Sequence, residues 1–247
     1  ETRSTNTNFR VANHAIELSV NIPETINTKK IPKITISAHN LNGVEENAKG
    51  TFNVFSLKQN TKVFRKRLWE QPDKHLFTRE EYYNTFPNDM YDDETNMYKW
   101  ERLQLMFSKN FDTKTSKAIS YNEFENLPQG VYVVETNCKD KNNQDVKTIN
   151  YVTIFNPSKN ELPVVKPFWT LPIKTTCEPG DTAKIIIASS YKNVYLLNRT
   201  ESEVDDNFQI ISTALNPIQT QINENHRGGI INHYVFVKNG RFYSYTN

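Results

Sequence analysis

The feature that most constrains this chain is an alternation of apolar and polar residues that recurs in short segments. In residues 14–22, for example, polar residues separate Ile16, Leu18 and Val20. A strand points successive side chains to opposite faces of its sheet, so each such segment predicts a strand with one buried face. The predicted strands are residues 14–22, 33–38, 51–57, 101–107, 124–127, 130–138, 146–155, 173–176, 182–188, 193–197, 208–214, 218–222, 230–237 and 241–245.

Turn residues separate many of these segments, as antiparallel pairing requires. Asn42-Gly43 is a turn signal, and Asn239-Gly240 lies between the last two predicted strands. Asn-Gly is typical of a tight hairpin. A polar stretch at residues 139–144 separates residues 130–138 from residues 146–155, so this pair is also predicted to be a hairpin.

Each predicted strand has a single apolar row, which a second sheet must cover. The sequence therefore predicts an all-β chain of two immunoglobulin- or fibronectin-III-like antiparallel β-sandwiches. Residues 156–167 contain three prolines and few apolar anchors, so we place the boundary there and expect domains at residues 1–160 and 161–247. Truncating a central residue such as Val133 or Ile186 to alanine is expected to cost about 2–5 kcal/mol.

Residues 63–100 interrupt the strand pattern in the first domain with a stretch dense in charged and aromatic residues. Within it, Thr78 and Glu81 have the spacing of a capping box, in which the two side chains satisfy each other's backbone N–H groups. The spacing predicts a short helix over residues 80–86, which ends before Pro87 because the residue before a proline avoids the helical region. The first sandwich is thus expected to carry a short helical insert.

The charge of the chain is nearly balanced, which narrows the range of partners. Its 247 residues carry 30 basic and 28 acidic side chains, for a net charge of +2. The sequence shows no basic stripe of the kind that follows a phosphate backbone, so we expect no nucleic-acid partner. No apolar run reaches the roughly 18–20 residues that span a bilayer. Because residues 1–13 are a polar lead-in to a strand, we expect the chain to be a piece of a longer protein.

Two cysteines are too few for a disulfide framework. Neither Cys138 nor Cys177 lies in a Cys-x-x-Cys or Cys/His metal pattern. The favoured interpretation is that both are buried or unused free thiols, and a single bridge between them is the alternative.

Three groups of residues suggest chemistry, and each also has a purely structural explanation. The acidic cluster Asp89, Asp92, Asp93 and Glu94 offers oxygen ligands for calcium, but it lacks the spacing and glycine of a calcium loop, so a solvated loop is favoured. The run from His226 to Gly229 offers a backbone nest for an anion with Arg227 alongside, and a strand-entry turn with positive φ at glycine is favoured.

The three tryptophans, Trp69, Trp100 and Trp169, are the remaining group. They are able to line a sugar-stacking face, but core or interdomain packing is the favoured interpretation. The histidines are scattered, and no serine lies in a Gly-x-Ser-x-Gly motif. We therefore predict no enzyme and assign no catalytic residue, no cofactor site and no metal ligand.

Several motifs resemble one family in their shared order. The chain resembles bacterial alpha-2-macroglobulin proteins of the Bacteroidetes type over most of its length. The motifs that carry the resemblance are residues 65–73 (RKRLWEQPD), 86–91 (FPNDMY), 127–132 (LPQGVY), 178–183 (EPGDTA), 193–197 (NVYLL) and 226–229 (HRGG).

The resemblance implies seven-stranded, fibronectin-like macroglobulin domains that form a cage around a protease after it cuts a bait segment. Some members carry a thioester in a Cys-Gly-Glu-Gln motif, which neither cysteine here matches. The implied function is that of non-catalytic structural domains whose parent traps or inhibits proteases. The implied partners are other domains of the parent and a protease, in the periplasm or at the cell surface. The alternative is a carbohydrate-binding or adhesive β-sandwich module of a cell-surface protein.

Overall fold

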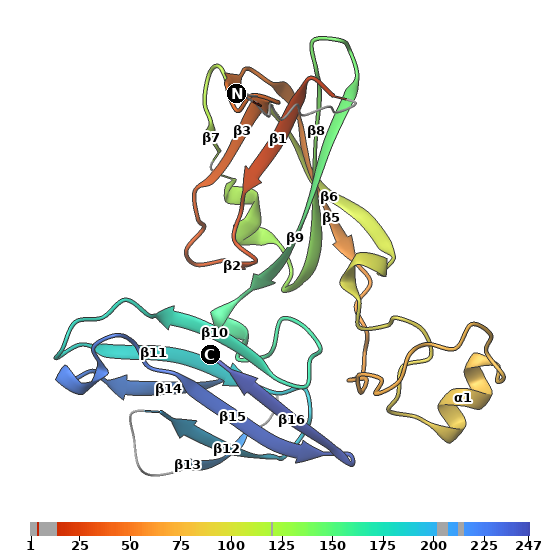
Figure 1. The fold of residues 1–247 in the computed structure, drawn as a ribbon, viewed down its shortest axis with the longest axis vertical. Coiled ribbons are helices and arrows are strands. Elements are labelled where there is room, and N and C mark those ends of the chain that lie inside the picture. The colour runs from red at the N-terminus through yellow and green to blue at the C-terminus, as the bar shows by residue number, and fades with distance from the viewer. Residues whose placement is uncertain (1–3, 5–13, 120, 202–206, 212–214) are drawn as a thin grey trace. The chain divides into compact units, whose positions relative to one another are not determined.

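The computed structural model describes residue 4 and residues 14–119, 121–201, 207–211 and 215–247. It is mostly β-structure, and the chain divides into two compact units (Figure 1). The first unit is Glu1–Lys58 with Glu101–Pro157, and the second is Gln59–Trp100 with Ser158–Asn247. The segment Gln59–Trp100, hereafter the insert, thus interrupts the first unit in sequence and belongs to the second in space. We describe each unit by itself.

The first unit contains two sheets. One is ordered β1-β3-β4, with β7 paired to β3, and the other is ordered β2-β9-β8-β5-β6. Their strands are β1 Ile16–Asn21, β2 Thr25–Asn27, β3 Ile34–Asn40, β4 Glu45–Glu46, β5 Lys49–Leu57, β6 Arg102–Asp112, β7 Ala118–Ile119, β8 Gly130–Lys139 and β9 Asp145–Phe155. All pairs are antiparallel except β2 with β9, which is parallel.

One apolar core joins these two sheets. Ile34 and Ile36 of β3 pack in the same cluster as Phe52 of β5 and Ile154 of β9, and all four are fully buried. The predicted alternation is observed in β3, where buried and half-buried residues alternate from Ile34 onward. The expected sandwich is therefore confirmed for this unit.

The second unit contains the sheets β10-β11-β14 and β13-β12-β15-β16, together with the insert. Its strands are β10 Trp169–Lys174, β11 Thr182–Ala188, β12 Val194–Thr200, β13 Asn207–Ile211, β14 Asn216–Gln221, β15 Asn232–Lys238 and β16 Arg241–Thr246. Ile187 of β11, Leu196 of β12 and Tyr234 of β15 share one core, so these two sheets also form an antiparallel sandwich. The last three residues of the predicted strand 208–214 lie outside the described residues.

The hairpin signals of the sequence are confirmed. Residues Asn239 and Gly240 have φ of 49° and 69°, and Lys238 pairs with Arg241 across them. Positive φ at both central residues is the geometry that asparagine and glycine favour in a two-residue hairpin turn. The hairpin β8–β9 is continuous from Gly130–Ile154 to Lys139–Asp145.

The predicted helix is α1, Arg79–Thr85, and its capping box is present (Figure 1). The remaining helical elements are the 3₁₀ turns η1 Met97–Lys99, η2 Asn122–Asn126, η3 Pro157–Lys159 and η4 Glu224–His226. In the described part of the chain, no helix is both long and apolar enough to cross a membrane.

Two expectations about the sandwich strands are wrong in detail. The sequence pattern predicts a strand over residues 124–127, but these residues lie in and after η2. In a 3₁₀ turn residues three apart share one face, which places Phe124 and Leu127 together in the core. The second error is Ile186, which is half-buried, whereas its neighbour Ile187 is fully buried. Residues 185–187 are three consecutive isoleucines, so the alternation of apolar and polar residues does not indicate which face of β11 points inward.

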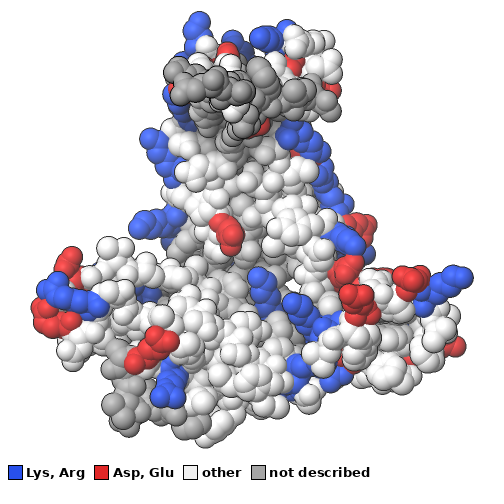
Figure 2. Space-filling model, in the orientation of Figure 1, with Lys and Arg blue, Asp and Glu red and all other residues white. Residues whose placement is uncertain are grey.

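Basic and acidic side chains are interspersed among the coloured residues in Figure 2. No continuous basic area covers the face drawn there. This mixture reflects the near balance of 30 basic and 28 acidic residues.

Substitutions at two adjacent positions of β11 test the orientation of that strand. Ile187→Ala removes a fully buried side chain and is expected to lower the free energy of unfolding by about 2–5 kcal/mol. Ile186→Ala removes a half-buried side chain from the opposite face and is expected to cost less than half as much. Urea denaturation measures both values, and an equal loss for the two variants would contradict the assigned inward face.

A second prediction concerns Glu135 on β8. Burial opposes its ionisation, but hydrogen bonds from Lys147, Asn137 and Arg102 outweigh that effect and lower its pKa from the ordinary 4.5 to about 2. A depressed pKa stabilises the fold above the unfolded pKa, and this contribution is lost as the pH falls from about 4.5 through about 2. Glu135→Gln is expected to remove about 2 kcal/mol at pH 7 and to flatten the pH dependence of unfolding in that window. Unchanged pH dependence would show that Glu135 is not tightly paired.

Candidate functional site

The insert is attached to the second sandwich through its first residues. Val63 is buried and packs in the same core as Phe168 and Ile187. Next to it, the backbone N–H of Arg65 donates to the carbonyl of Asn88 at 2.6 Å. The insert is therefore part of the packing of the second unit rather than a free loop.

Arg65 joins three parts of this unit. Its Nε donates to Oδ1 of Asp89 at 2.7 Å, and its Nη2 bonds Oδ2 of the same carboxylate. Its Nη1 donates to the carbonyl of Asn239, at the turn between β15 and β16, at 2.7 Å. Asp89 is buried, and its hydrogen bonds raise the pKa of Arg65. A two-pronged contact of this kind fixes both side chains in one geometry.

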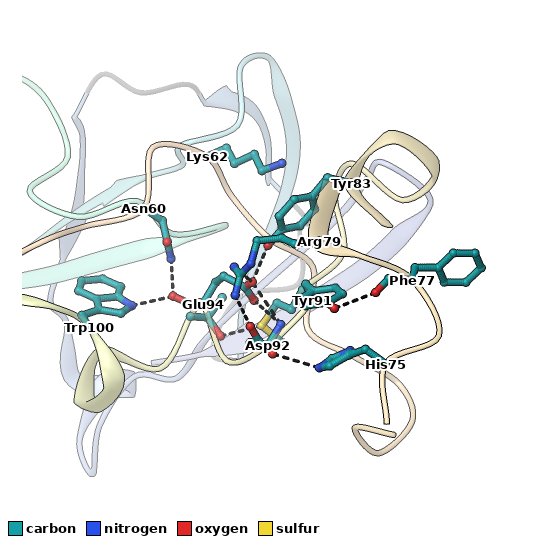
Figure 3. A network of polar contacts seen from close by, with 12 residues as sticks. Asn60, Lys62, His75, Phe77, Arg79, Tyr83, Tyr91, Asp92, Glu94 and Trp100 are labelled. Atoms are coloured by element: carbon teal, nitrogen blue, oxygen red, sulfur yellow. Dashed lines mark hydrogen bonds and ion pairs between the residues drawn. The ribbon is translucent and has the colours of Figure 1, made fainter. Parts of the chain in front are cut away.

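A second set of charged contacts holds α1 to the end of the insert (Figure 3). Arg79, the first residue of α1, pairs with Asp92 and, at 3.1 Å, with Oε1 of Glu94. The hydroxyl of Tyr83 donates to the same carboxylate. Burial and this hydrogen bond raise the pKa of Tyr83.

Glu94 lies at the centre of these contacts. Its carboxylate accepts the backbone N–H of Asp92 at 3.1 and 3.0 Å. Its carbonyl accepts the indole N–H of Trp100 at 2.6 Å and the side-chain amide of Asn60 (Figure 3). We call the contacts made by Arg65, Asp89, Arg79, Asp92 and Glu94 the polar frame.

The polar frame accounts for the acidic cluster. Asp89 pairs with Arg65, Asp93 with Lys99, and the other two carboxylates with Arg79. The solvated-loop interpretation is wrong for Asp89, because this residue is buried. Within the described residues, no group of three or more His, Cys, Asp and Glu side chains is arranged to hold a metal ion.

Large apolar side chains lie exposed on the segment that the polar frame supports. Leu68, Trp69, Leu76 and Phe77 are 76%, 62%, 91% and 47% exposed. We call residues 68–77 the apolar loop. An exposed apolar patch with a polar rim is typical of an interaction surface.

Tyr91 ties the apolar loop to the polar frame. Its hydroxyl donates to the carbonyl of Phe77 at 2.8 Å, and its ring stacks on His75 with centroids 4.0 Å apart. Nε2 of His75 lies 3.2 Å from Oδ1 of Asp92 (Figure 3). Arg67 donates to the carbonyl of Tyr91 at 3.1 Å. Both ends of the apolar loop are thus held by specific contacts.

The three tryptophans have different environments. Trp169 is buried, as the packing interpretation expects, and Trp100 is half-buried with its N–H used in the polar frame. Only Trp69 of these three is largely exposed.

The run His226–Gly229 forms the turn that enters β15. η4 ends at His226, and Gly228 and Gly229 follow with φ of 98° and 124°. The favoured interpretation, a strand-entry turn with positive φ at glycine, is confirmed. Both cysteines are free thiols: Cys138 is buried and Cys177 is half-buried. Burial raises the pKa of Cys138.

Sequence reasoning identifies the residues of the insert but not their roles. The partners in the polar frame are far apart in sequence: Arg65 and Asp89 are separated by 24 positions, and Arg65 and Asn239 by 174. The only signal is the density of charged and aromatic residues in 63–100. The capping box is visible because its two members are three residues apart.

Comparison with known proteins gives no family. No protein-family model matches the sequence, and no curated protein matches it. The structure is similar to that of red sea bream transglutaminase over 96% of this chain and 31% of the transglutaminase chain, with 8% identity and a TM-score of 0.30. This chain therefore spans about a third of the length of that protein. A likeness of this degree carries no information about activity.

The role of Arg65 is directly testable. Arg65→Ala leaves the Asp89 carboxylate buried without its cation and is expected to cost about 3 kcal/mol of stability. It is also expected to speed proteolysis within residues 68–77, because the insert loses its contact with Asn239. Chemical denaturation and limited proteolysis measure the two effects.

Lys99→Ala is the matched control. It breaks an exposed pair with Asp93 and is expected to cost less than about 1 kcal/mol. If the two variants had equal stability and equal proteolysis rates, Arg65 would not anchor the insert.

Proposed function

We propose that this chain supplies two non-catalytic scaffold domains of a macroglobulin-like protein and that the apolar loop contacts another domain of the same parent. The observation that carries the proposal is the exposure of Leu68, Trp69, Leu76 and Phe77 on a segment held by the polar frame. Fully burying a leucine or phenylalanine side chain is worth about 1.5–3 kcal/mol. Burying these side chains against another domain therefore strongly favours association.

The polar frame lowers the cost of such a contact. Ordering a flexible loop at an interface costs about 0.5–1.5 kcal/mol for each immobilised side chain. Here Tyr91 and Arg67 already restrain the loop in the free chain. A surface that is ordered before it meets its partner is suited to a permanent contact between neighbouring domains.

The resemblance to bacterial alpha-2-macroglobulins supports the same proposal. Two of its motifs, residues 65–73 and 86–91, contain Arg65 and Asp89, whose side chains pair in the polar frame. The residues that carry the resemblance are thus residues that shape the insert. On this proposal the parent resides in the periplasm or at the cell surface, where it traps proteases.

The carbohydrate-binding alternative depends on exposed tryptophans. Trp69 meets that requirement with 62% exposure. Trp100 does not, because it is half-buried and its N–H is bonded to the carbonyl of Glu94. A single exposed tryptophan beside two exposed leucines favours a protein contact over a sugar-stacking platform.

Protease protection by the full-length parent tests the proposal. After cleavage by a protease, the parent is expected to block the bound protease from large protein substrates but not from small peptide substrates. The double variant Trp69→Ser/Leu76→Ser is expected to reduce this shielding, because it weakens the contact between domains. Its effect on the stability of this chain is expected to be small, because both side chains are exposed.

Val44→Ser in the parent is the control, since Val44 is 59% exposed and lies outside the insert. This variant is expected to shield as the unaltered parent does. If the cleaved parent leaves large substrates accessible, trapping is wrong. If the parent instead binds a glycan array and loses that binding in Trp69→Ser, the carbohydrate alternative is correct.

A further inference from the structure

A cavity of about 400 Å³ opens in the second sandwich. Residues from β11, β14 and the turn at His226–Gly229 line it, together with the loop that follows β10. This volume falls in the range of roughly 300–1,000 Å³ that small-molecule sites occupy. The proposed scaffold function does not use this cavity.

One side of the cavity is apolar. Ile185 of β11 and Ile218 of β14 line it and are direct cross-strand partners. Both are only half-buried, although both pack against the core of the sandwich. Ile222 and Ile230 extend the same surface. The cavity therefore lies where the core is incompletely covered, and burying the apolar part of a ligand there is favourable.

The other side of the cavity carries hydrogen-bond donors. His226 lines it and is 9% exposed. The backbone N–H of Asn223 donates to Nδ1 of His226 at 3.1 Å, so the neutral imidazole carries its proton on Nε2. Within the described residues, no group accepts a hydrogen bond from this Nε2–H or from the backbone N–H groups of Gly228 and Ile230. These three residues line the cavity, so their N–H groups are available to donate to an acceptor on a ligand.

The charges around the opening favour an anion over a cation. Arg227 and Lys174 line the cavity, whereas Glu178 is the single acidic side chain that does so among the residues described. Arg227 also contacts Glu224, which is 69% exposed, and Lys174 contacts Asp181 at 3.0 Å. Exposed pairs of this kind contribute little energy, so Arg227 is able to exchange Glu224 for a ligand carboxylate at small cost.

We propose that this cavity binds a small amphipathic carboxylate, with its aliphatic body on Ile185 and Ile218 and its carboxylate at His226–Gly229. The glycines are central to the second contact. Apart from the glycine itself and its two chain neighbours, no atom lies within 4 Å of a Cβ position at Gly228 or Gly229, so the backbone there is open to close approach by an anion. Binding is non-covalent and involves no bond change.

Calorimetric titration of the 247-residue chain with octanoate tests this proposal. Saturable binding with one site is expected. Octanol keeps the aliphatic body and acetate keeps the carboxylate, and each alone is expected to bind at least about tenfold more weakly than octanoate. Octanol binding as tightly as octanoate would overturn the assignment of the donors, and absence of saturable octanoate binding would overturn the site.

Two variants locate the ligand. Thr220→Phe fills the cavity from β14 and is expected to abolish octanoate binding. Arg227→Gln changes an exposed side chain, so it leaves the fold intact and is expected to weaken binding by about tenfold. Lys192→Gln, which removes an exposed cation that does not line the cavity, is the control and is expected to bind normally. Unchanged binding in both cavity variants would contradict the location.

Discussion

In each unit, two sheets pack apolar faces against each other, and the need to keep these faces from water determines the architecture. In the first unit, β3 presents Ile34 and Ile36 to Phe52 and Ile154 of the facing sheet. In the second, Ile187 meets Leu196 and Tyr234 in the same way. Because strand side chains alternate, this requirement fixes register as well as layering: a slip by one residue would turn every apolar row outward.

The insert shows how a charged segment becomes part of such a fold. Val63 supplies an apolar anchor, and the polar frame then fixes the chain around it, most of all through the largely shielded pair of Arg65 and Asp89. Shielded pairs are costly to break because one buried charge remains without its partner. The segment therefore keeps a defined shape although α1 buries none of its residues.

The sequence predicts what depends on neighbouring residues. The capping box at Thr78 and Glu81, the hairpin turn at Asn239-Gly240 and the alternation in β3 all have their cause within a few positions. Prediction fails where distant residues decide. Residues 124–127 form a turn because Phe124 and Leu127 both reach the core, and the inward face of β11 depends on what packs against Ile187.

The sequence predicts only the composition of the candidate site, not the contacts between its residues. A dense mixture of charges and aromatic residues identifies residues 63–100, but pairing between Arg65 and Asp89 depends on the folded backbone, which brings them together across the bridge they form. The exposure of Leu68 and Leu76 contradicts the ordinary tendency of leucine to be buried. The exposure of these two leucines is recognisable only when the residues that form the core are known.

The second unit is assembled from two separate stretches of chain, Gln59–Trp100 and Ser158–Asn247. During synthesis, Val63 and Arg65 leave the ribosome long before β11 and the β15–β16 turn that receive them. Residues 59–100 therefore lack their packing partners, and the apolar loop stays in water, while the rest of the first unit is synthesised. A fragment cut at the proline-rich segment would separate Val63 from its core, so the two sandwiches are divisible in space but not by a single cut in sequence.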